Sequence, residues 1–422
     1  MARLGIYPNC NRLMLWYHRS VVARTYRSTH PWITFSLKTF TQAFQPEVWS
    51  WLGECQSKCD HIAGVPLPPS VADRLHRLYL AKGILGTTAI EGNTLSEKDV
   101  LSFLDGKLEL PPSREYLAQE IENIVNGCRM IFDRIMAGNP MPLNAETFSL
   151  FNRMVLEKLA LDADVVPGEI RHHSVGVFRY RGAPHEECEY LLNRLGEWLT
   201  GPEFDGPPNQ RIALAIVKAI VAHLYLAWIH PFGDGNGRTA RLTELQILLA
   251  SGVPSPAAHL LSNHYNQTRT EYYRQLDYSS QSGGDISRFI RYAVQGLRDG
   301  LATQIQEIRG TQLEITWRFF VHEQFSDRKS AADKRRRDLV LAMSNYEQPV
   351  PTSKLPEVST EAAVAYQGKR MTLGRDIKEL VDMGLVVRSG KGWMANKKLI
   401  EAFLPARAKL ESGLTTGIAK TS

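Results

Sequence analysis

Twelve consecutive residues, His230 to Arg241, combine side chains that suit chemistry on phosphate groups: one histidine, one aspartate, three glycines and two arginines. An imidazole titrates near neutral pH, so His230 could take a proton from an attacking hydroxyl. Asp234 offers the hard oxygen ligand that Mg²⁺ prefers beside phosphates. A base and a metal-binding carboxylate this close together predict a site for transferring a phosphate-containing group.

The segments on both sides of this stretch predict how it is held. A mostly apolar stretch from Ile212 to Ile229, broken by Lys218 and His223, predicts a buried helix, and Pro231 prevents that helix from continuing. Glycines then precede a second helix, whose N-terminal N–H groups would form an anion site. Arg238 and Arg241, three residues apart, would lie on one face of that helix and extend the site toward more phosphates.

The segment matches H-x-F-x-[DE]-G-N-G-R-x-x-R at every specified position, and so resembles the signature of the Fic (Fido) family. The resemblance extends over roughly residues 69–305. It implies a mainly α fold with a short β-hairpin flap. It also implies a protein adenylyltransferase, which moves AMP from ATP, with Mg²⁺, to a serine, threonine or tyrosine hydroxyl of a target protein, which could be the chain itself.

The resemblance implies a role for each residue of the loop. His230 would be the general base, and Asp234 would hold Mg²⁺ between the α- and β-phosphates. Phe232 would anchor the loop in the core. The anion hole would be formed by Gly235, Asn236 and Gly237. Arg238 would contact the β-phosphate, and Arg241 would contact the γ-phosphate.

Two further segments resemble parts of the family's nucleotide site. Residues 170–181 predict a hairpin with Gly176 and Gly182 as turn candidates, and Val175 and Gly176 resemble the flap over the active site. An exposed strand there could pair with an extended target segment. Tyr272 and Tyr273 match a pair that lies near the adenine in relatives, although simple helix packing is an equal alternative. Ser280 stands where some relatives have asparagine, which leaves the choice of nucleotide open.

A second motif, Thr87-x-x-x-Glu91-Gly92, ends the helix expected over residues 70–93. It resembles the inhibitory motif of the Fic proteins whose inhibitor precedes the core in the same chain. The alternative is an ordinary helix C-terminus. The resemblance implies that Glu91 pairs with Arg241 and keeps the γ-phosphate from its partner.

The rest of the chain predicts further domains. Residues 1–68 are expected to be an N-terminal extension, of which the first 30 or so, rich in arginine and without acidic residues, are non-native or disordered, with the true start near Trp32. Residues 69–310 would form the core. Residues 326–410 predict a winged-helix-like domain, with a helix capped by Thr372 and a turn at residues 389–392, and residues 411–422 a disordered tail.

Composition is that of a globular protein: 43% hydrophobic residues, 22% charged residues and a net charge of +6. No uninterrupted apolar run reaches the roughly 18–20 residues of a membrane span. Five irregularly spaced cysteines fit reduced thiols, and therefore a cytoplasmic protein, better than a disulfide framework.

Alternative functions stay open from the sequence. The same site could remove AMP from a modified protein, or transfer UMP, GMP or phosphocholine. The C-terminal domain could make the chain a transcription regulator, with Arg370, Arg375, Lys378 and Lys391 facing DNA. Because Asp376, Glu379 and Asp382 dilute that charge, a docking or oligomerisation role is preferred for it. Homo-oligomer formation is undecided.

Overall fold

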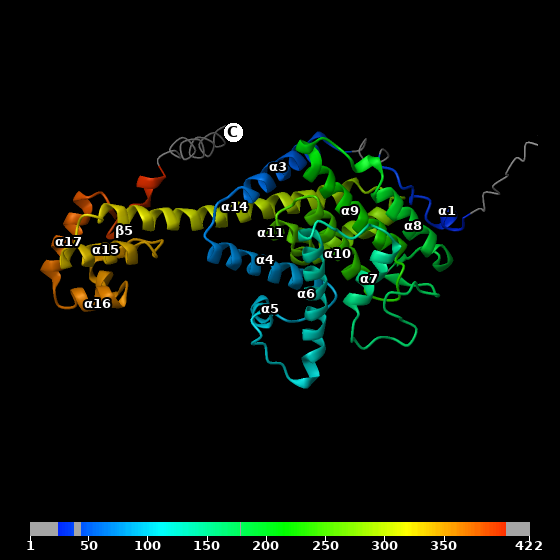
Figure 1. Cartoon of the computed structure of the whole chain (residues 1–422), viewed down its shortest axis with the longest axis horizontal. Coiled ribbons are helices and arrows are strands. Elements are labelled where there is room, and N and C mark those ends of the chain that lie inside the picture. Colours follow the sequence, from blue (N-terminus) through cyan, green and yellow to red (C-terminus); the bar gives the residue numbers. More distant parts are fainter. Residues whose placement is uncertain (1–23, 38–43, 178, 402–422) are drawn as a thin grey trace, which may run out of the picture. The chain divides into compact units, whose positions relative to one another are not determined.

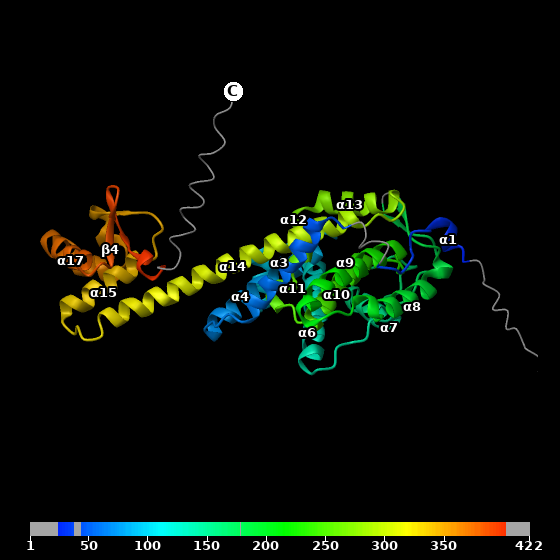
Figure 2. The same ribbon diagram turned by 90° about the horizontal axis from the view of Figure 1, so that it is seen from above.

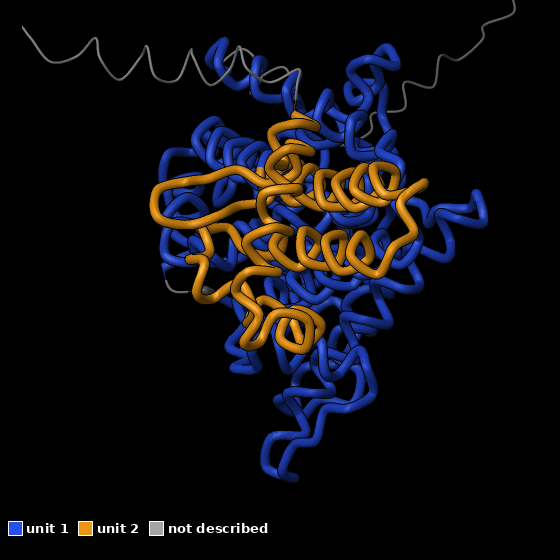
Figure 3. The backbone as a smooth tube through the Cα atoms, turned by 90° about the vertical axis from the view of Figure 1, so that its left-hand side faces the viewer, with its two compact units in different colours: residues 1–302 blue, residues 303–422 orange. Residues whose placement is uncertain are grey.

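The computed structural model describes residues 24–37, 44–177 and 179–401 (Figure 1). The tail expected at 411–422 and most of the arginine-rich start therefore lie outside the described residues. The chain forms two compact units, Met1–Ala302 and Thr303–Ser422, drawn in different colours in Figure 3. Their division falls within the long helix α14 (Ser287–Gln324). The domain limits expected from the sequence stay predictions.

The first unit is almost entirely helical, which confirms the predicted fold class (Figures 1 and 2). Its elements before α14 are, in chain order, α1 (Tyr26–Thr29), α3 (Pro46–Ala63), α4 (Pro69–Ala89), α5 (Glu97–Leu104), η1 (Pro112–Arg114), α6 (Glu115–Met136), α7 (Ala145–Val155), β1 (Gly176–Val177), β2 (Tyr180–Arg181), η2 (His185–Glu187), α8 (Cys188–Leu199), η3 (Pro202–Phe204), η4 (Pro208–Gln210), α9 (Arg211–Ile229), α10 (Asn236–Ala250), α11 (Ser255–Ala258), α12 (Leu260–Gln267) and α13 (Arg269–Gln281).

Helix α9 forms the centre of this unit, and α3, α8 and α10 pack around it. It is apolar on every side because neighbours cover every side, and its residues Ile216, Ile220 and Leu224 are fully buried. By length and composition the stretch Pro208–Ile229 could cross a bilayer, yet 78% of its most apolar window is buried within the fold. That burial is what a core helix of a globular protein shows.

Helix α4, which contains the start of the expected inhibitory motif, is held in position by neighbouring helices. Helix α4 packs against α5, α6, α11 and α12. Glycine is required at Gly86, because a Cβ there would lie 2.7 Å from the backbone oxygen of Ser262 in α12. After α4 the chain turns at Gly92, with φ +106°, into α5, where Ser96 and Asp99 form a capping box. The end of α4 is thereby fixed in position.

Residues 24–37 pack against the helical core rather than lying outside it. Tyr26 and Ile33 are buried, and the carboxylate of Glu187 accepts hydrogen bonds from the Thr25 N–H and from Arg24. Residues 24–30 belong to the stretch expected from the sequence to be non-native or disordered, and that expectation stays a prediction.

In its described residues the second unit contains the C-terminal part of α14, three further α-helices and a small sheet. Its elements after α14 are α15 (Ala331–Met343), β3 (Val350–Pro351), η5 (Thr352–Glu357), α16 (Thr360–Tyr366), α17 (Arg370–Asp382), β4 (Val386–Ser389), β5 (Gly392–Ala395) and η6 (Lys397–Ile400). The antiparallel strands lie in the order β3-β5-β4, with Val350 opposite Trp393 and Val387 opposite Met394. The predicted cap is wrong: Thr372 lies inside α17, which begins two residues earlier. The winged-helix interpretation stays a prediction.

Candidate active site

The site is built where α9 ends. His230 adopts the left-handed conformation, with φ 49° and ψ 59°, which costs a non-glycine residue roughly 1–2 kcal/mol. Arg171, which is 3% exposed, holds this backbone: its Nε donates to the His230 carbonyl at 2.7 Å, and its N–H donates to the Pro231 carbonyl at 3.0 Å. The strained conformation is therefore imposed by its surroundings.

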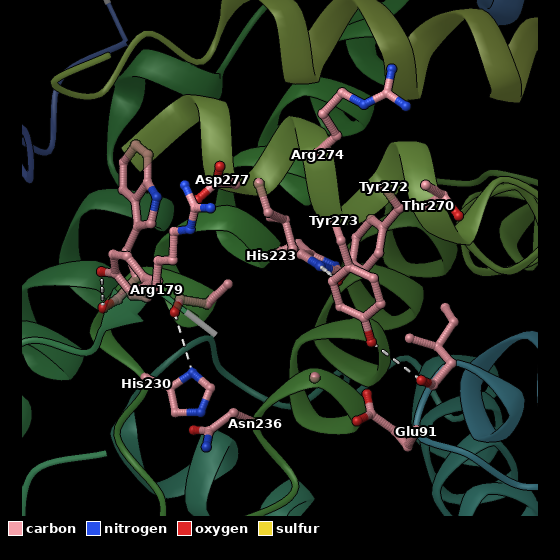
Figure 4. Close-up of a pocket in the computed structure, with 16 residues that line it drawn as sticks. Glu91, Arg179, His223, His230, Asn236, Thr270, Tyr272, Tyr273, Arg274 and Asp277 are labelled. Carbon is pink, nitrogen blue, oxygen red and sulfur yellow. Dashed lines mark hydrogen bonds between the residues drawn. The ribbon is translucent and has the colours of Figure 1, made fainter. Parts of the chain in front are cut away.

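The imidazole of His230 is oriented by one hydrogen bond. Its Nδ1 lies 3.3 Å from the Ala227 carbonyl (Figure 4). Because a carbonyl can only accept, Nδ1 carries the proton and Nε2 is left as the acceptor. Burial lowers the pKa of His230 to about 4, and the Arg171 guanidinium acts in the same direction. The ring is therefore neutral near pH 7.

The loop after His230 is locked by two asparagines. The Asn236 side chain bonds both backbone groups of Phe232, accepting from its N–H at 3.0 Å and donating to its carbonyl at 2.8 Å. Asn152, fully buried on α7, donates to the Asp234 carbonyl at 2.8 Å and accepts from the Gly168 N–H. The buried Phe232 ring anchors the loop, as the resemblance implies.

Two glycines let this loop form an anion cradle at the start of α10. Gly235 takes φ +76°, a conformation that glycine adopts without cost. The first amides of α10 have no carbonyl partner within the helix. A Cβ on Gly237 would collide with Oε1 of Glu91 and lie 3.1 Å from Nη1 of Arg241. The Glu91 carboxylate thus lies against the first turn of α10.

Arg238 and Arg241 are 5% and 2% exposed, so both guanidinium groups lie inside the fold. Arg238 Nη2 contacts the Asp234 carboxylate at 3.2 Å, and Glu120 of α6 lies 3.5 Å from its Nη1. Among the described residues, the Nε atoms of both arginines have no hydrogen-bond partner. Buried donors of this kind fit a ligand that brings oxygen acceptors, such as a polyphosphate.

Asp234 has the properties of a Mg²⁺ ligand that works together with phosphates. Its side chain is 51% exposed and lies beside the cradle at the start of α10. Mg²⁺ is commonly bound by one or two carboxylates, with water and phosphate oxygens completing the octahedron. Within residues 24–37, 44–177 and 179–401 no cluster of three His, Cys, Asp or Glu side chains forms a metal site.

Glu91 lies just past α4, in the turn before α5, rather than inside the helix expected over residues 70–93. Its Oε1 accepts from Nη2 of Arg241 at 2.5 Å. Burial alone would raise the pKa of Glu91, but Arg241 outweighs it and holds that pKa below the ordinary value. The carboxylate is therefore charged and paired.

Three neighbours fix this turn. The Tyr273 hydroxyl donates to the Ile90 carbonyl at 3.3 Å, and Arg269 donates to the Ala89 carbonyl at 3.2 Å. The buried Asn93 donates to the Leu117 carbonyl at 3.0 Å and to Glu120 at 2.8 Å. Since Glu120 also approaches Arg238, it connects the turn that carries Glu91 to the first turn of α10.

A cavity of about 450 Å³ is lined by some of these groups, whereas Asp234, Gly235, Arg238 and Arg241 are not among its lining residues. Figure 4 shows His230, Asn236 and Glu91 along one side and Tyr272, Thr270 and Arg274 along another. Tyr273 and Gly237 also line it, whereas the predicted Val175 and Gly176 do not. From the same hairpin, Arg179 and Tyr180 take that place. Ser280 lines a neighbouring cavity, and Asp277 lines both.

The predicted hairpin is shorter than residues 170–181. Only Gly176–Val177 and Tyr180–Arg181 pair, and Ile170 instead bridges to Phe232 in the catalytic loop. Neither glycine forms the turn: Gly176 lies in β1, and Gly182 follows β2, where a Cβ would lie 2.9 Å from the Cβ of His230. Gly182 serves close packing against the histidine.

Tyr272 is held by a buried network that the sequence did not indicate. Its hydroxyl lies 2.9 Å from Nε2 of His223, and Nδ1 of His223 lies 3.0 Å from Oε2 of Glu244. The Tyr265 hydroxyl donates to the other oxygen of Glu244 at 3.0 Å, while its ring stacks on Tyr272 at 4.9 Å. This closed set of contacts fixes one wall of the cavity.

Comparison with known proteins identifies this arrangement. The model of the Fic/DOC family matches residues 142–248, which include the hairpin, α9, the catalytic loop and most of α10. Residues 142–248 form a Fic domain. The resemblance seen in the signature residues is thereby confirmed.

Relatives extend the similarity beyond the Fic domain. Protein adenylyltransferase fic-1 of Caenorhabditis elegans is 30% identical over 213 residues, 50% of this chain and 38% of that protein. Protein adenylyltransferase Fic of Nematostella vectensis is 25% identical over 244 residues, 58% of this chain and 53% of that protein. The chain thus spans about half or less of the length of these curated relatives.

Solved structures agree in fold. A Fic family protein from Desulfovibrio desulfuricans has a TM-score of 0.52 at 20% identity, covering 82% of this chain and 92% of that chain. Fic-1 from C. elegans has a TM-score of 0.51 at 23% identity, covering 63% and 73%.

Proposed function

We propose that this chain is a protein adenylyltransferase that transfers AMP from ATP to a serine, threonine or tyrosine hydroxyl of a target protein. The names of its relatives support the proposal, as does the cradle at the start of α10 beside two buried arginines. In the transfer, the hydroxyl oxygen bonds to the α-phosphorus, the bond from that phosphorus to its bridging oxygen breaks, and pyrophosphate leaves. Positioning and charge neutralisation supply most of the catalysis in such reactions.

His230 is the proposed general base. With Nδ1 donating to Ala227, the neutral ring presents Nε2 to the proton of the attacking hydroxyl. The left-handed backbone and the Arg171 bond to the His230 carbonyl hold the ring at the cavity wall. A base fixed before the substrate arrives loses little entropy when it reacts.

The amides of the first turn of α10, with Arg238 and Arg241, are the proposed phosphate site. Asp234 would hold Mg²⁺ beside it, and the bound ion would offset negative charge on the phosphates. The Asp234–Arg238 contact at 3.2 Å keeps the carboxylate next to that site. The aromatic wall of Tyr272 and Tyr273 fits a planar base.

The observation that carries the proposal of autoinhibition is the position of Glu91. Its carboxylate contacts Arg241 and lies over Gly237, where the polyphosphate should bind. A γ-phosphate would have to displace this carboxylate or turn away from it. Turning away would rotate the α-phosphorus out of line with the hydroxyl.

The proposed docking place of the target is the hairpin β1–β2. A two-stranded ribbon has unpaired backbone groups on its outer edges, which an extended segment can use. Gly182 directly follows β2 and packs against His230. A segment paired there would lie near the base.

The experiment is incubation of the purified chain with Mg²⁺ and ATP labelled at the α-phosphate, comparing wild type, Glu91→Gly and Glu91→Gly/His230→Ala. We expect protein labelling to rise in the single variant and to vanish in the double variant. Labelled UTP, GTP and CDP-choline are tested in parallel. If one of them labels the protein better than ATP does, the transferred group is UMP, GMP or phosphocholine instead of AMP. Release of AMP from pre-labelled protein without net labelling would indicate removal instead. Absence of both reactions in a folded Glu91→Gly protein refutes the proposal.

A further inference from the structure

Helix α17 of the second unit exposes a basic face. Arg370, Arg375 and Lys378 are exposed, while Leu373, Ile377 and Leu380 on the opposite face are buried. At 100° per residue the three basic positions fall within about 140° of the helix surface. The same helix contains three acidic residues, Asp376, Glu379 and Asp382, whose negative charge would disfavour an anionic partner if they lay on the basic face.

The structure removes the largest part of that objection. Asp376 is 1% exposed and faces inward, where it accepts from Nε of Arg335 at 2.7 Å and from Nε of Arg336 at 2.8 Å. The Tyr366 hydroxyl donates a third bond at 3.0 Å. Burial would raise the pKa of Asp376, but these donors hold it below its ordinary value. Its negative charge is neutralised inside the unit.

The two other carboxylates lie beyond the N-terminal two turns of the helix. Glu379 is paired with Arg328 at 2.9 Å, at the border of the buried side. Asp382 is exposed and shares the angular range of the basic positions, but it is the last residue of α17, one turn after Lys378. The N-terminal two turns of the helix therefore present basic groups to solvent without an exposed acid among them.

The surroundings of this face suit a groove in a duplex. Gly374 is exposed between the basic positions, and a Cβ there would meet nothing within 4 Å, so the helix can approach a partner closely. Helices α15 and α16 and strand β4 pack against α17, whereas within the described residues Arg370, Arg375 and Lys378 are exposed to solvent. The β4–β5 hairpin follows directly and exposes Lys391 in its turn. The major groove of B-DNA is wide enough for one such helix.

We propose that the second unit binds duplex DNA through the exposed face of α17, with Arg370, Arg375 and Lys378 contacting phosphates and Lys391 contacting the flanking backbone. This binding is separate from the proposed transfer reaction, since none of its residues belongs to the Fic site. Phosphate contacts of this kind give sequence-independent affinities of about 10⁻⁴–10⁻⁶ M at physiological salt, and each contact steepens the salt dependence.

The test uses the full chain and a fluorescein-labelled 30-base-pair duplex of random sequence, with anisotropy recorded from 25 to 200 mM KCl. Three to four phosphate contacts predict a slope of about −3 in log K against log salt. Arg370→Ala/Arg375→Ala/Lys378→Ala should flatten that slope by about one unit per lost contact. The matched control, Arg309→Ala/Arg318→Ala/Lys354→Ala, removes three exposed charges of the same unit outside α17 and should leave the slope unchanged.

Three results would overturn the proposal: no binding at 25 mM KCl, an equal loss in the control variant, or equal affinity for a single-stranded oligonucleotide of the same length. AMP labelling from ATP, measured for each variant in a Glu91→Gly background, tests the proposed transferase function independently of DNA binding. The α17 variant should keep full labelling, and His230→Ala should keep full DNA binding. Each proposal can therefore fail while the other stands.

Discussion

Replacing Glu91 by glycine should raise AMP incorporation at least about tenfold, because the change removes a competitor of the γ-phosphate. The carboxylate lies at the N-terminus of α10 and accepts from Arg241. Without it, a γ-phosphate can take the same guanidinium. The nucleotide can then bind with its α-phosphorus in line with the attacking hydroxyl.

The size of the expected rate increase follows from the contact between Glu91 and Arg241. The Arg241 side chain is 1% exposed, whereas 32% of the Glu91 side chain reaches solvent, so the pair is strong but open to exchange. A hydrogen bond between charged groups contributes about 1.5–3 kcal/mol. At 1.4 kcal/mol per factor of ten, loss of this bond corresponds to about 10- to 100-fold. Arg241 keeps its bond to the Thr87 carbonyl at 3.0 Å, so the variant should still fold.

The assay is incorporation of α-labelled AMP at matched protein concentrations, with thermal melts to confirm cooperative unfolding. Glu91→Gln keeps the shape but removes the charge, and should give an intermediate rate. The matched control is Glu109→Gly, which removes an exposed carboxylate in the loop after α5 and should leave the rate unchanged. A Glu91→Gly protein that melts cooperatively and labels no faster than wild type would refute the reasoning.

Other expected outcomes test the base, the metal ligand and the turn. His230→Ala should lose about 10²–10⁴-fold in rate and keep its ATP-induced thermal shift. Because burial lowers the pKa of His230 to about 4, the rate of Glu91→Gly should stay flat from pH 8 down to about 5.5 and fall only below it; a fall centred near 6.5 would contradict a buried imidazole. Since the pKa of Glu91 is also held low, acidification to pH 5 should not relieve inhibition in wild type. Asp234→Ala should leave a residual rate that EDTA no longer lowers. Asn93→Ala should activate severalfold by loosening the turn, whereas the exposed Asn139→Ala should have no effect on labelling.

Much of the active site could be predicted because its residues are close in the sequence. Pro231 and the glycines after it end one helix and start the next, so His230, Gly237 and Arg241 come together by local geometry alone. The long helices α4 and α9 could be predicted for the same reason, since apolar spacing and apolar runs depend only on neighbouring residues.

The supports of the loop could not be predicted in this way. Arg171 and Asn152 bond the loop from about 60 and 80 positions away, and nothing in their local sequence marks them as partners. Each strand of the hairpin has only two residues, too few for an alternating pattern that could indicate where its turn lies. Polar residues that act across the fold become visible only when the fold is known.

Two carboxylates paired with arginine, Asp376 and Glu91, differ in how easily another anion can replace them. Asp376 accepts from Arg335, Arg336 and Tyr366 and is 1% exposed, so an incoming anion would have to break three bonds inside a core to replace it. Its effect is to take negative charge away from the surface of α17. Glu91 accepts from Arg241, and it lines a cavity. A phosphate that offers more acceptor oxygens can displace it. The number of donors and the access of solvent therefore decide which pair serves the structure and which can act as a switch.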